Sequence, residues 1–223
     1  MRLGYSVKQK TKIAIFLFGV MVCIILIRVL EDKSVKELNK SVASLYDDRL
    51  IPATDLFYIA ENLYAKRYLL NNIIENQDDA AYIAAIKKLG GHDDRVKGLM
   101  EKYEKTFLTT TEKQQIELLK KHLKSYNSLE GEILKKRGNL DEDVYAKRND
   151  SLFNGLINQL TTLTHIQKAV GEELIQNSKF EASNSKIYSN IQFALATVIG
   201  ILIVAVISTT NEPRVTPRDY NQN

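Results

Sequence analysis

The chain has 223 residues, with 31 Lys and Arg, 27 Asp and Glu, one cysteine and no tryptophan. This length is enough for one domain plus anchoring segments, and a single cysteine excludes an intrachain disulfide and a cysteine cluster for metal. The net charge of +4 does not indicate nucleic-acid binding, because the basic excess lies in the segments that flank residues 31–190.

The first element is an apolar run that predicts a membrane helix over residues 13–30. It is uncharged from Ile13 to Ile27, near the ~20 residues that span a ~30 Å hydrocarbon core, and Arg28 can snorkel to the headgroups. The alternative is a cleaved signal peptide, since the preceding residues are basic. No small-residue cleavage site follows the run, which favours an uncleaved anchor.

A second apolar run predicts another membrane helix over residues 191–210. Residues 1–12 carry four Lys and Arg and no acid, so the positive-inside rule predicts a cytoplasmic N-terminal tail. Two spans then return the tail of residues 211–223 to the cytoplasm. We therefore expect a membrane protein of two spans, with residues 31–190 forming a periplasmic or extracellular domain next to the lipid bilayer.

The region between the runs is predicted to be helical, because no stretch alternates with a period of two. Steps of three and four residues give a seam typical of coiled-coil-like packing. The seam begins directly after the first run, so we expect the membrane helix to continue outward without a break. It consists of Val35, Leu38, Val42, Leu45, Arg49, Pro52, Leu56, Ile59, Leu63, Lys66, Leu70 and Ile73.

Turn signals divide the rest into three further helices. Residues 76–79 read as a turn in which an aspartate caps the next helix. Gly90-Gly91 predicts a kink or local break in that helix, since each glycine costs about 1 kcal/mol against alanine. Thr109 and Glu112 then have the spacing of a capping box.

The last helix follows a stop signal at Gly138-Asn139 and begins among the acidic residues 141–143. Gln167 occupies one position of its apolar seam. Together these signals predict an all-α, antiparallel up-down four-helix bundle whose first and last helices continue into two transmembrane helices.

Signatures of catalysis are weak. The three histidines, His92, His122 and His165, show no paired metal-ligand spacing, and the sequence has no GxSxG, P-loop or GxGxxG motif. We therefore expect no enzyme activity, no cofactor, no metal and no nucleic-acid partner.

Basic residues on the first seam are the candidates for function. One interpretation is that the stems of Arg49 and Lys66 lie along the seam with their charged heads in water. The alternative is a small-anion site between helices. In that site Arg67 clamps a carboxylate, Lys66 adds charge, and Tyr64 and Tyr68 close around the ligand.

Pro52 lies inside the first long helix, beside Arg49. A proline there removes a backbone donor and clashes with the preceding turn. We expect a kink at Pro52, with Thr54 capping the restarted helix, where bending is localised when the bundle shifts.

The stretch SLYDDRLIPATDL, residues 44–56, carries a Leu-Tyr, Asp-Arg and Pro pattern, and Arg67 follows it. It resembles the first helix of the four-helix-bundle ligand-binding domain of bacterial methyl-accepting chemotaxis receptors. The order of elements also resembles that family over about residues 10–210. The resemblance implies a bundle that dimerises, binds a small metabolite or a binding protein, and moves one helix relative to its neighbours. It makes Arg67 the positional candidate for the ligand.

The sequence departs from the family after the second run. A receptor continues into a HAMP linker and a methylated cytoplasmic hairpin, whereas residues 211–223 contain two prolines and predict no long helix. We therefore expect a non-enzymatic sensor for a small molecule or partner, acting as a homodimer or through a partner membrane signalling protein. The alternatives are a structural or assembly protein that docks or dimerises without a ligand, and a receptor remnant without output domains.

Overall fold

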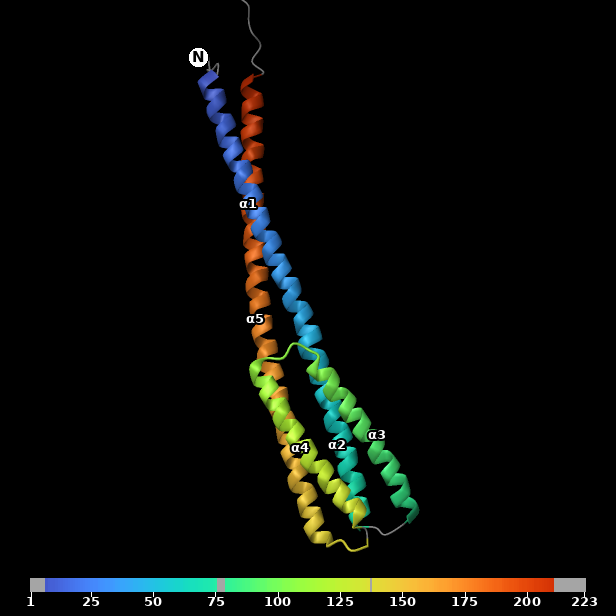
Figure 1. Cartoon of the computed structure of the whole chain (residues 1–223). Coiled ribbons are helices and arrows are strands. Elements are labelled where there is room, and N and C mark those ends of the chain that lie inside the picture. Colours follow the sequence, from blue (N-terminus) through green and yellow to red (C-terminus); the bar gives the residue numbers. More distant parts are fainter. Residues whose placement is uncertain (1–6, 76–78, 137, 211–223) are drawn as a thin grey trace, which may run out of the picture. The chain divides into compact units, whose positions relative to one another are not determined.

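The computed structural model describes residues 7–75, 79–136 and 138–210, and nearly all of them are helical (Figure 1). The elements are α1 (Val7–Leu45), the π-helical turn η1 (Tyr46–Leu50), α2 (Ile51–Glu75), α3 (Asp79–Glu104), α4 (Thr110–Lys135) and α5 (Glu142–Thr210). The chain divides into two compact units. One is Lys40–Asn177, and the other combines Met1–Asn39 with Ser178–Asn223.

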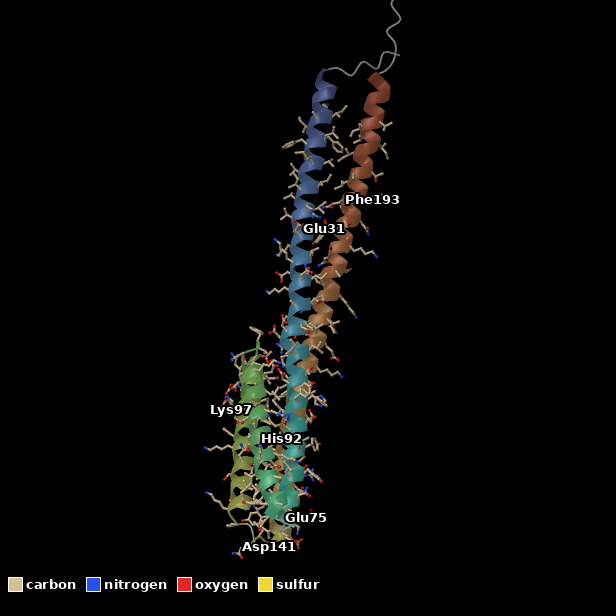
Figure 2. The ribbon with its side chains drawn as sticks, turned by 90° about the vertical axis from the view of Figure 1, so that its right-hand side faces the viewer. Glu31, Glu75, His92, Lys97, Asp141 and Phe193 are labelled. Atoms are coloured by element: carbon tan, nitrogen blue, oxygen red, sulfur yellow. The ribbon has the colours of Figure 1, made fainter. Side chains whose placement is uncertain are left out.

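The unit Lys40–Asn177 is a four-helix bundle. Glu75 at the end of α2 and Asp141 just before α5 lie at one end of it, and the α3–α4 connection lies at the other end (Figures 1 and 2). Successive helices therefore run in opposite directions. The predicted all-α, up-down four-helix bundle is confirmed.

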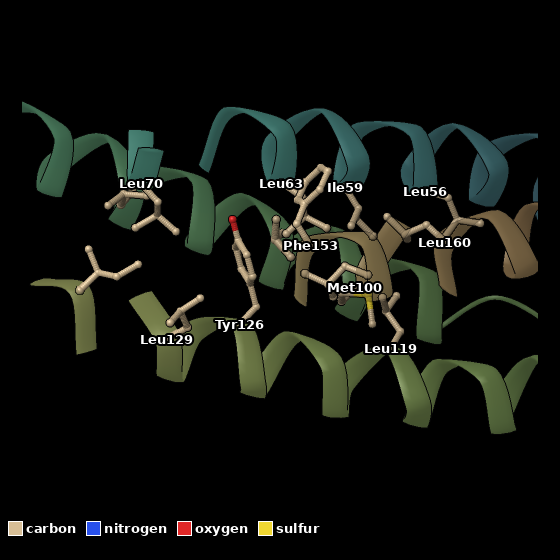
Figure 3. Packing of buried hydrophobic residues seen from close by; sticks show 14 of the residues in the cluster. Leu56, Ile59, Leu63, Leu70, Met100, Leu119, Tyr126, Leu129, Phe153 and Leu160 are labelled. Carbon is tan, nitrogen blue, oxygen red and sulfur yellow. The ribbon is translucent and has the colours of Figure 1, made fainter. Parts of the chain in front are cut away.

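The core of the bundle is one cluster of apolar side chains from all four helices (Figure 3). The seam of the first long helix enters this cluster from Leu56 onward, since Ile59, Leu63 and Leu70 are 0% exposed. Burying each such side chain contributes about 1.5–3 kcal/mol before the entropy cost of ordering it. Periodic burial of large aliphatic residues is therefore what holds α2 against its neighbours.

Before η1 only two of the four predicted seam residues are packed, Leu38 and Leu45, which are half-buried. Val42 is 54% exposed and Val35 is 39% exposed, whereas Ser41 is half-buried. A π-helical turn holds one more residue than an α-helical turn, so the residues before it are turned about the helix axis relative to those after it. The expectation that Val35 and Val42 belong to the packed seam is therefore wrong.

Local capping signals gave correct helix ends. Thr109 Oγ1 accepts a hydrogen bond from Glu112 N at 3.2 Å, and Glu112 Oε2 accepts one from Thr109 N at 2.7 Å, which confirms the capping box. Gly138 follows the end of α4 with a φ of 88°, a conformation that favours glycine. Asp141 Oδ1 accepts from Val144 N at 3.2 Å at the start of α5.

The predicted break at Gly90-Gly91 is wrong, because α3 runs continuously from Asp79 to Glu104. Leu89 and Val96 on either side are buried in the core, and their burial outweighs a helix-propensity cost of about 1 kcal/mol per glycine. The predicted capping turn before α3 falls largely on residues 76–78, which lie outside the described residues.

The other unit contains both apolar runs. Two helical stretches, Lys12–Glu75 and Glu142–Val204, are long and apolar enough to cross a membrane, with mean hydropathies of 3.0 and 1.9 in their most apolar windows. Only 6% and 0% of those windows are buried. Phe18 is 63% exposed and Phe193 is 77% exposed. Large exposed apolar surface marks contact with a membrane or a partner, so the chain has two candidate membrane spans.

Candidate functional site: buried charges and an arginine on the bundle surface

Four buried polar side chains are joined by hydrogen bonds around the carboxylate of Glu112. We call Arg49, Tyr103, Glu112 and Gln167 the Arg49 cluster. They come from η1, α3, α4 and α5, and all four are buried. Arg49 Nη1 lies 2.9 Å from Glu112 Oε1 and donates to Gln167 Oε1 at 3.2 Å, and Arg49 Nη2 donates to the carbonyl oxygen of Phe107 at 3.0 Å.

Glu112 is the acceptor at the centre of the cluster. Besides Arg49, its Oε1 accepts from Gln167 Nε2 at 2.7 Å and from the Tyr103 hydroxyl at 3.5 Å. Burial raises the pKa of the Tyr103 phenol to about 12, so the hydroxyl is neutral and can donate. Removing one member of a buried ion pair costs about 3–5 kcal/mol, because the remaining charge is left uncompensated. The Arg49 cluster therefore holds η1 against α3, α4 and α5.

A second buried cluster surrounds Lys66, farther along α2. Lys66 is 1% exposed, and its ammonium pairs with Asp93 of α3 and with Glu130 Oε2 of α4 at 2.7 Å. It also donates to Asn127 Oδ1 at 2.9 Å and lies 5.7 Å from the ring centroid of Tyr126. Desolvation raises the pKa of the Glu130 carboxyl, and the nearby ammonium of Lys66 opposes that rise.

These contacts overturn the interpretation that the heads of Arg49 and Lys66 lie in water. Both heads are enclosed, at 5% and 1% exposure, and each is paired with a carboxylate from another helix. An unpaired charge is too costly in a core, whereas a paired and hydrogen-bonded one persists. The two seam positions therefore carry polar links between helices.

Arg67, the next residue, points to a different side of α2. Its Nη2 lies 2.8 Å from Asp150 Oδ1 of α5, and its guanidinium lies 4.7 Å from the ring centroid of Phe153. Tyr64 meets the same ring edge-on at 4.8 Å. Arg67 remains one-third exposed, while Tyr64 and Tyr68 are 52% and 66% exposed.

Lys66 therefore does not lie on the same surface as the other residues of the predicted anion site. Arg67 and Tyr64 share one surface with Phe153 and Asp150, whereas the ammonium of Lys66 is directed to α3 and α4. An exposed guanidinium beside aromatic rings can bind a carboxylate through two parallel hydrogen bonds. Within the chain, the carboxylate bound to the Arg67 guanidinium is that of Asp150.

Within residues 7–75, 79–136 and 138–210, no group of three His, Cys, Asp or Glu side chains could hold a metal ion. His92 Nδ1 lies 2.7 Å from Asn62 Oδ1. Desolvation and the nearby cations Arg95 and Lys66 lower the pKa of His92.

Sequence reasoning identified Arg49 and Lys66 but not their partners. The sequence predicts Glu112 only as part of the capping box with Thr109. The one further signal was Gln167, a polar residue at a seam position of the last helix. Polar residues that interrupt the seams of different helices are the pattern that could have indicated a shared buried cluster.

The fold and these clusters define a helical bundle: four packed helices linked by buried polar contacts, with two candidate membrane spans. Residues 4–182 match the family described as the four helix bundle sensory module for signal transduction. The chain belongs to this family, and the resemblance to the sensory module of chemotaxis receptors is confirmed. Comparison with curated proteins and with solved structures gave no match.

Proposed function

We propose that the protein is a non-enzymatic sensor in a bacterial plasma membrane. In this proposal residues 13–30 and 191–210 span the bilayer, both termini are cytoplasmic, and the bundle of residues 31–190 senses a small molecule outside. The single observation that carries the proposal is the match of residues 4–182 to a sensory module for signal transduction. The signal passes sideways to another membrane protein when the packing of the bundle helices changes.

The ligand site that we propose centres on Arg67. Its ion pair with Asp150 joins two half-exposed side chains, at 33% and 50% exposure, so both remain accessible to a solute. Exposed pairs of this kind contribute little to stability, about 0–1 kcal/mol. A small carboxylate can therefore displace Asp150 from the guanidinium at low cost, with Tyr64 and Phe153 packing against the apolar part of the ligand.

Thermal unfolding of the full chain in lipid nanodiscs tests this site. A panel of amino acids, organic acids and amines should contain at least one carboxylate that raises the melting temperature, and Arg67→Ala should abolish that rise. Arg148→Ala is the matched control, because Arg148 also pairs with a glutamate, Glu132, at 2.8 Å and lies over a ring, that of Tyr145, at 5.3 Å. Stabilisation that survives in Arg67→Ala, or none with any carboxylate, would contradict the site.

A second candidate function is docking or dimerisation without a ligand, and one observation favours it. Four large aromatic side chains of α2 are exposed at 46–66%, although the chain has only 8% aromatic residues. Aromatic residues are enriched at protein interfaces. The four are Phe57, Tyr58, Tyr64 and Tyr68.

Cysteine cross-linking of the full chain in membranes separates the two candidates. In a Cys23→Ala background, Phe57→Cys should give symmetric dimers if α2 faces a second copy. Lys97→Cys on α3 is the control and should remain monomeric. Dimers without any ligand response would favour the docking role, whereas monomers at Phe57→Cys would remove it.

A further inference from the structure

The π-helical turn η1 interrupts the helix that leads from the first candidate span into the bundle. Ile51 N donates to the carbonyl oxygen of Tyr46, five residues earlier. Such turns are rare, occur mostly as single turns inside α-helices, and are frequent at functional sites. Pro52 supplies a cause, because in an α-helix its ring would clash with the carbonyl of Asp48, four residues earlier. A wider turn relieves that clash.

Both backbone polar groups of Phe107, in the loop between α3 and α4, contact η1. Phe107 N donates to Asp48 Oδ1 at 3.2 Å, and the Phe107 carbonyl oxygen accepts from Arg49 Nη2 at 3.0 Å. Arg49 is also bound to Glu112 and Gln167. Its Nε, however, is buried and has no hydrogen-bond acceptor within the described part of the chain. A buried donor without an acceptor carries a desolvation cost. The unpaired Nε of Arg49 therefore offsets part of the stabilisation that the Arg49 cluster gives to η1.

The apolar pattern before η1 fits a different register. Val42 is seven residues before Arg49, so an unbroken α-helix would place both on nearly the same face. In the structure Val42 is 54% exposed, whereas Ser41 is half-buried. The position of Val42 in the sequence therefore fits an α-helical turn at residues 46–50. With the π turn, Ser41 is more buried than Val42.

We infer that η1 is a two-state element. In the π state the Arg49 cluster and the contacts of Asp48 hold the wide turn, and Ser41 is more buried than Val42. In the α state the turn tightens and the preceding residues rotate by about 100°, the angle that one residue subtends in an α-helix, so that Val42 replaces Ser41. The inference rests on the proposed function and deepens it, because it names the element through which a change in the Arg49 cluster would turn the helix that enters the membrane.

Single-cysteine reactivity in the full chain measures the register directly. In a Cys23→Ala background, Ser41→Cys or Val42→Cys is modified with a water-soluble maleimide in nanodiscs. We expect the cysteine at 42 to react roughly tenfold faster than the cysteine at 41. Pro52→Ala removes the clash and restores a backbone donor, so the ratio should fall roughly tenfold or invert. Pro217→Ala is the control and should leave it unchanged.

Arg49→Met is a second variant, which removes the buried guanidinium and should move the ratio in the same direction. It decides the matter if Pro52→Ala does not fold. Equal reactivity at 41 and 42 in the parent protein overturns the inference at once, as does an unchanged ratio in a folded Pro52→Ala or Arg49→Met protein. The assay contains no ligand and no partner. If the reactivity ratio does not change, only the two-state inference fails, and the proposed sensor is unaffected. If the ratio changes but no ligand raises the melting temperature in the thermal-unfolding screen, only the proposed sensor is contradicted.

Discussion

Arg49 of η1 and Glu112 of α4 form a 2.9 Å ion pair in which the two side chains are 5% and 0% exposed. The same carboxylate completes the capping box with Thr109 at the start of α4. One acidic residue therefore both begins a helix and neutralises the buried arginine of another. Tyr103 of α3 and Gln167 of α5 also contact this carboxylate, so polar side chains of η1, α3, α4 and α5 meet here.

The stability of the bundle should depend strongly on this pair. Arg49→Met leaves the charge of Glu112 buried without its cation, so we expect the unfolding free energy to fall by about 3–5 kcal/mol. Circular dichroism during thermal or denaturant unfolding of the full chain in detergent measures the loss. The double variant Arg49→Met/Glu112→Gln should recover part of it, because glutamine is uncharged and can still cap α4. Strictly additive losses would contradict the pairing.

Glu130 should make the bundle less stable as the pH rises. Burial raises the pKa of its carboxyl in the folded state. Between the ordinary and the raised pKa the folded state binds more protons than the unfolded state, so the unfolding free energy decreases with rising pH. Glu130→Gln removes this loss. The melting temperature of Glu130→Gln minus that of the parent should therefore increase as the pH rises from about 4 to 7, by roughly 2–4 °C for each kcal/mol.

Glu132 is the control of opposite sign. Its hydrogen bond with Arg148 lowers the pKa of the Glu132 carboxyl. That contribution is present above the unfolded pKa and is lost as the pH falls through the folded one. Glu132→Gln should therefore lower the melting temperature slightly at pH 7 and converge with the parent in acid. A pH dependence of the same sign for both variants would show that Glu130 is not destabilised by burial.

The glycines of α3 should be replaceable. Gly90 and Gly91 are exposed, and no atom lies within 4 Å of a Cβ built on either. Gly90→Ala and Gly91→Ala should each raise the unfolding free energy by about 0.5–1 kcal/mol. Gly138→Ala should lower it by about 1–2 kcal/mol, because φ at Gly138 is 88°. A loss of stability in Gly90→Ala would mean that α3 needs flexibility at this point.

Much of the bundle could be predicted because its signals are local or periodic. The capping box at Thr109 and Glu112 involves residues three apart, and the seam from Leu56 to Ile73 repeats one pattern of large apolar side chains. The predicted break at Gly90-Gly91 is wrong because it relied on a local signal alone. Helix propensity is a local term, and the burial of Leu89 and Val96 on the same helix exceeds it.

The buried clusters could not be predicted to the same depth. Arg49 pairs with residues 63 and 118 positions away, and Lys66 with residues on two other helices. Seam periodicity shows that a charge enters the core, but the partner depends on how four helices align lengthwise. The π turn depends on the same alignment, because Arg49 and Asp48 reach Phe107 only when α3 and α4 are in place.

Membrane topology is the claim on which the sensor account depends most directly. In a Cys23→Ala background, Lys97→Cys in α3 should be labelled by a membrane-impermeant maleimide in intact cells, since Lys97 is exposed on the bundle (Figure 2). Ser6→Cys and Asn221→Cys should be labelled only after the inner membrane is permeabilised. Protection of the cysteine at 97 in intact cells, or labelling of either terminal cysteine there, would contradict a sensor whose bundle lies outside the cytoplasm.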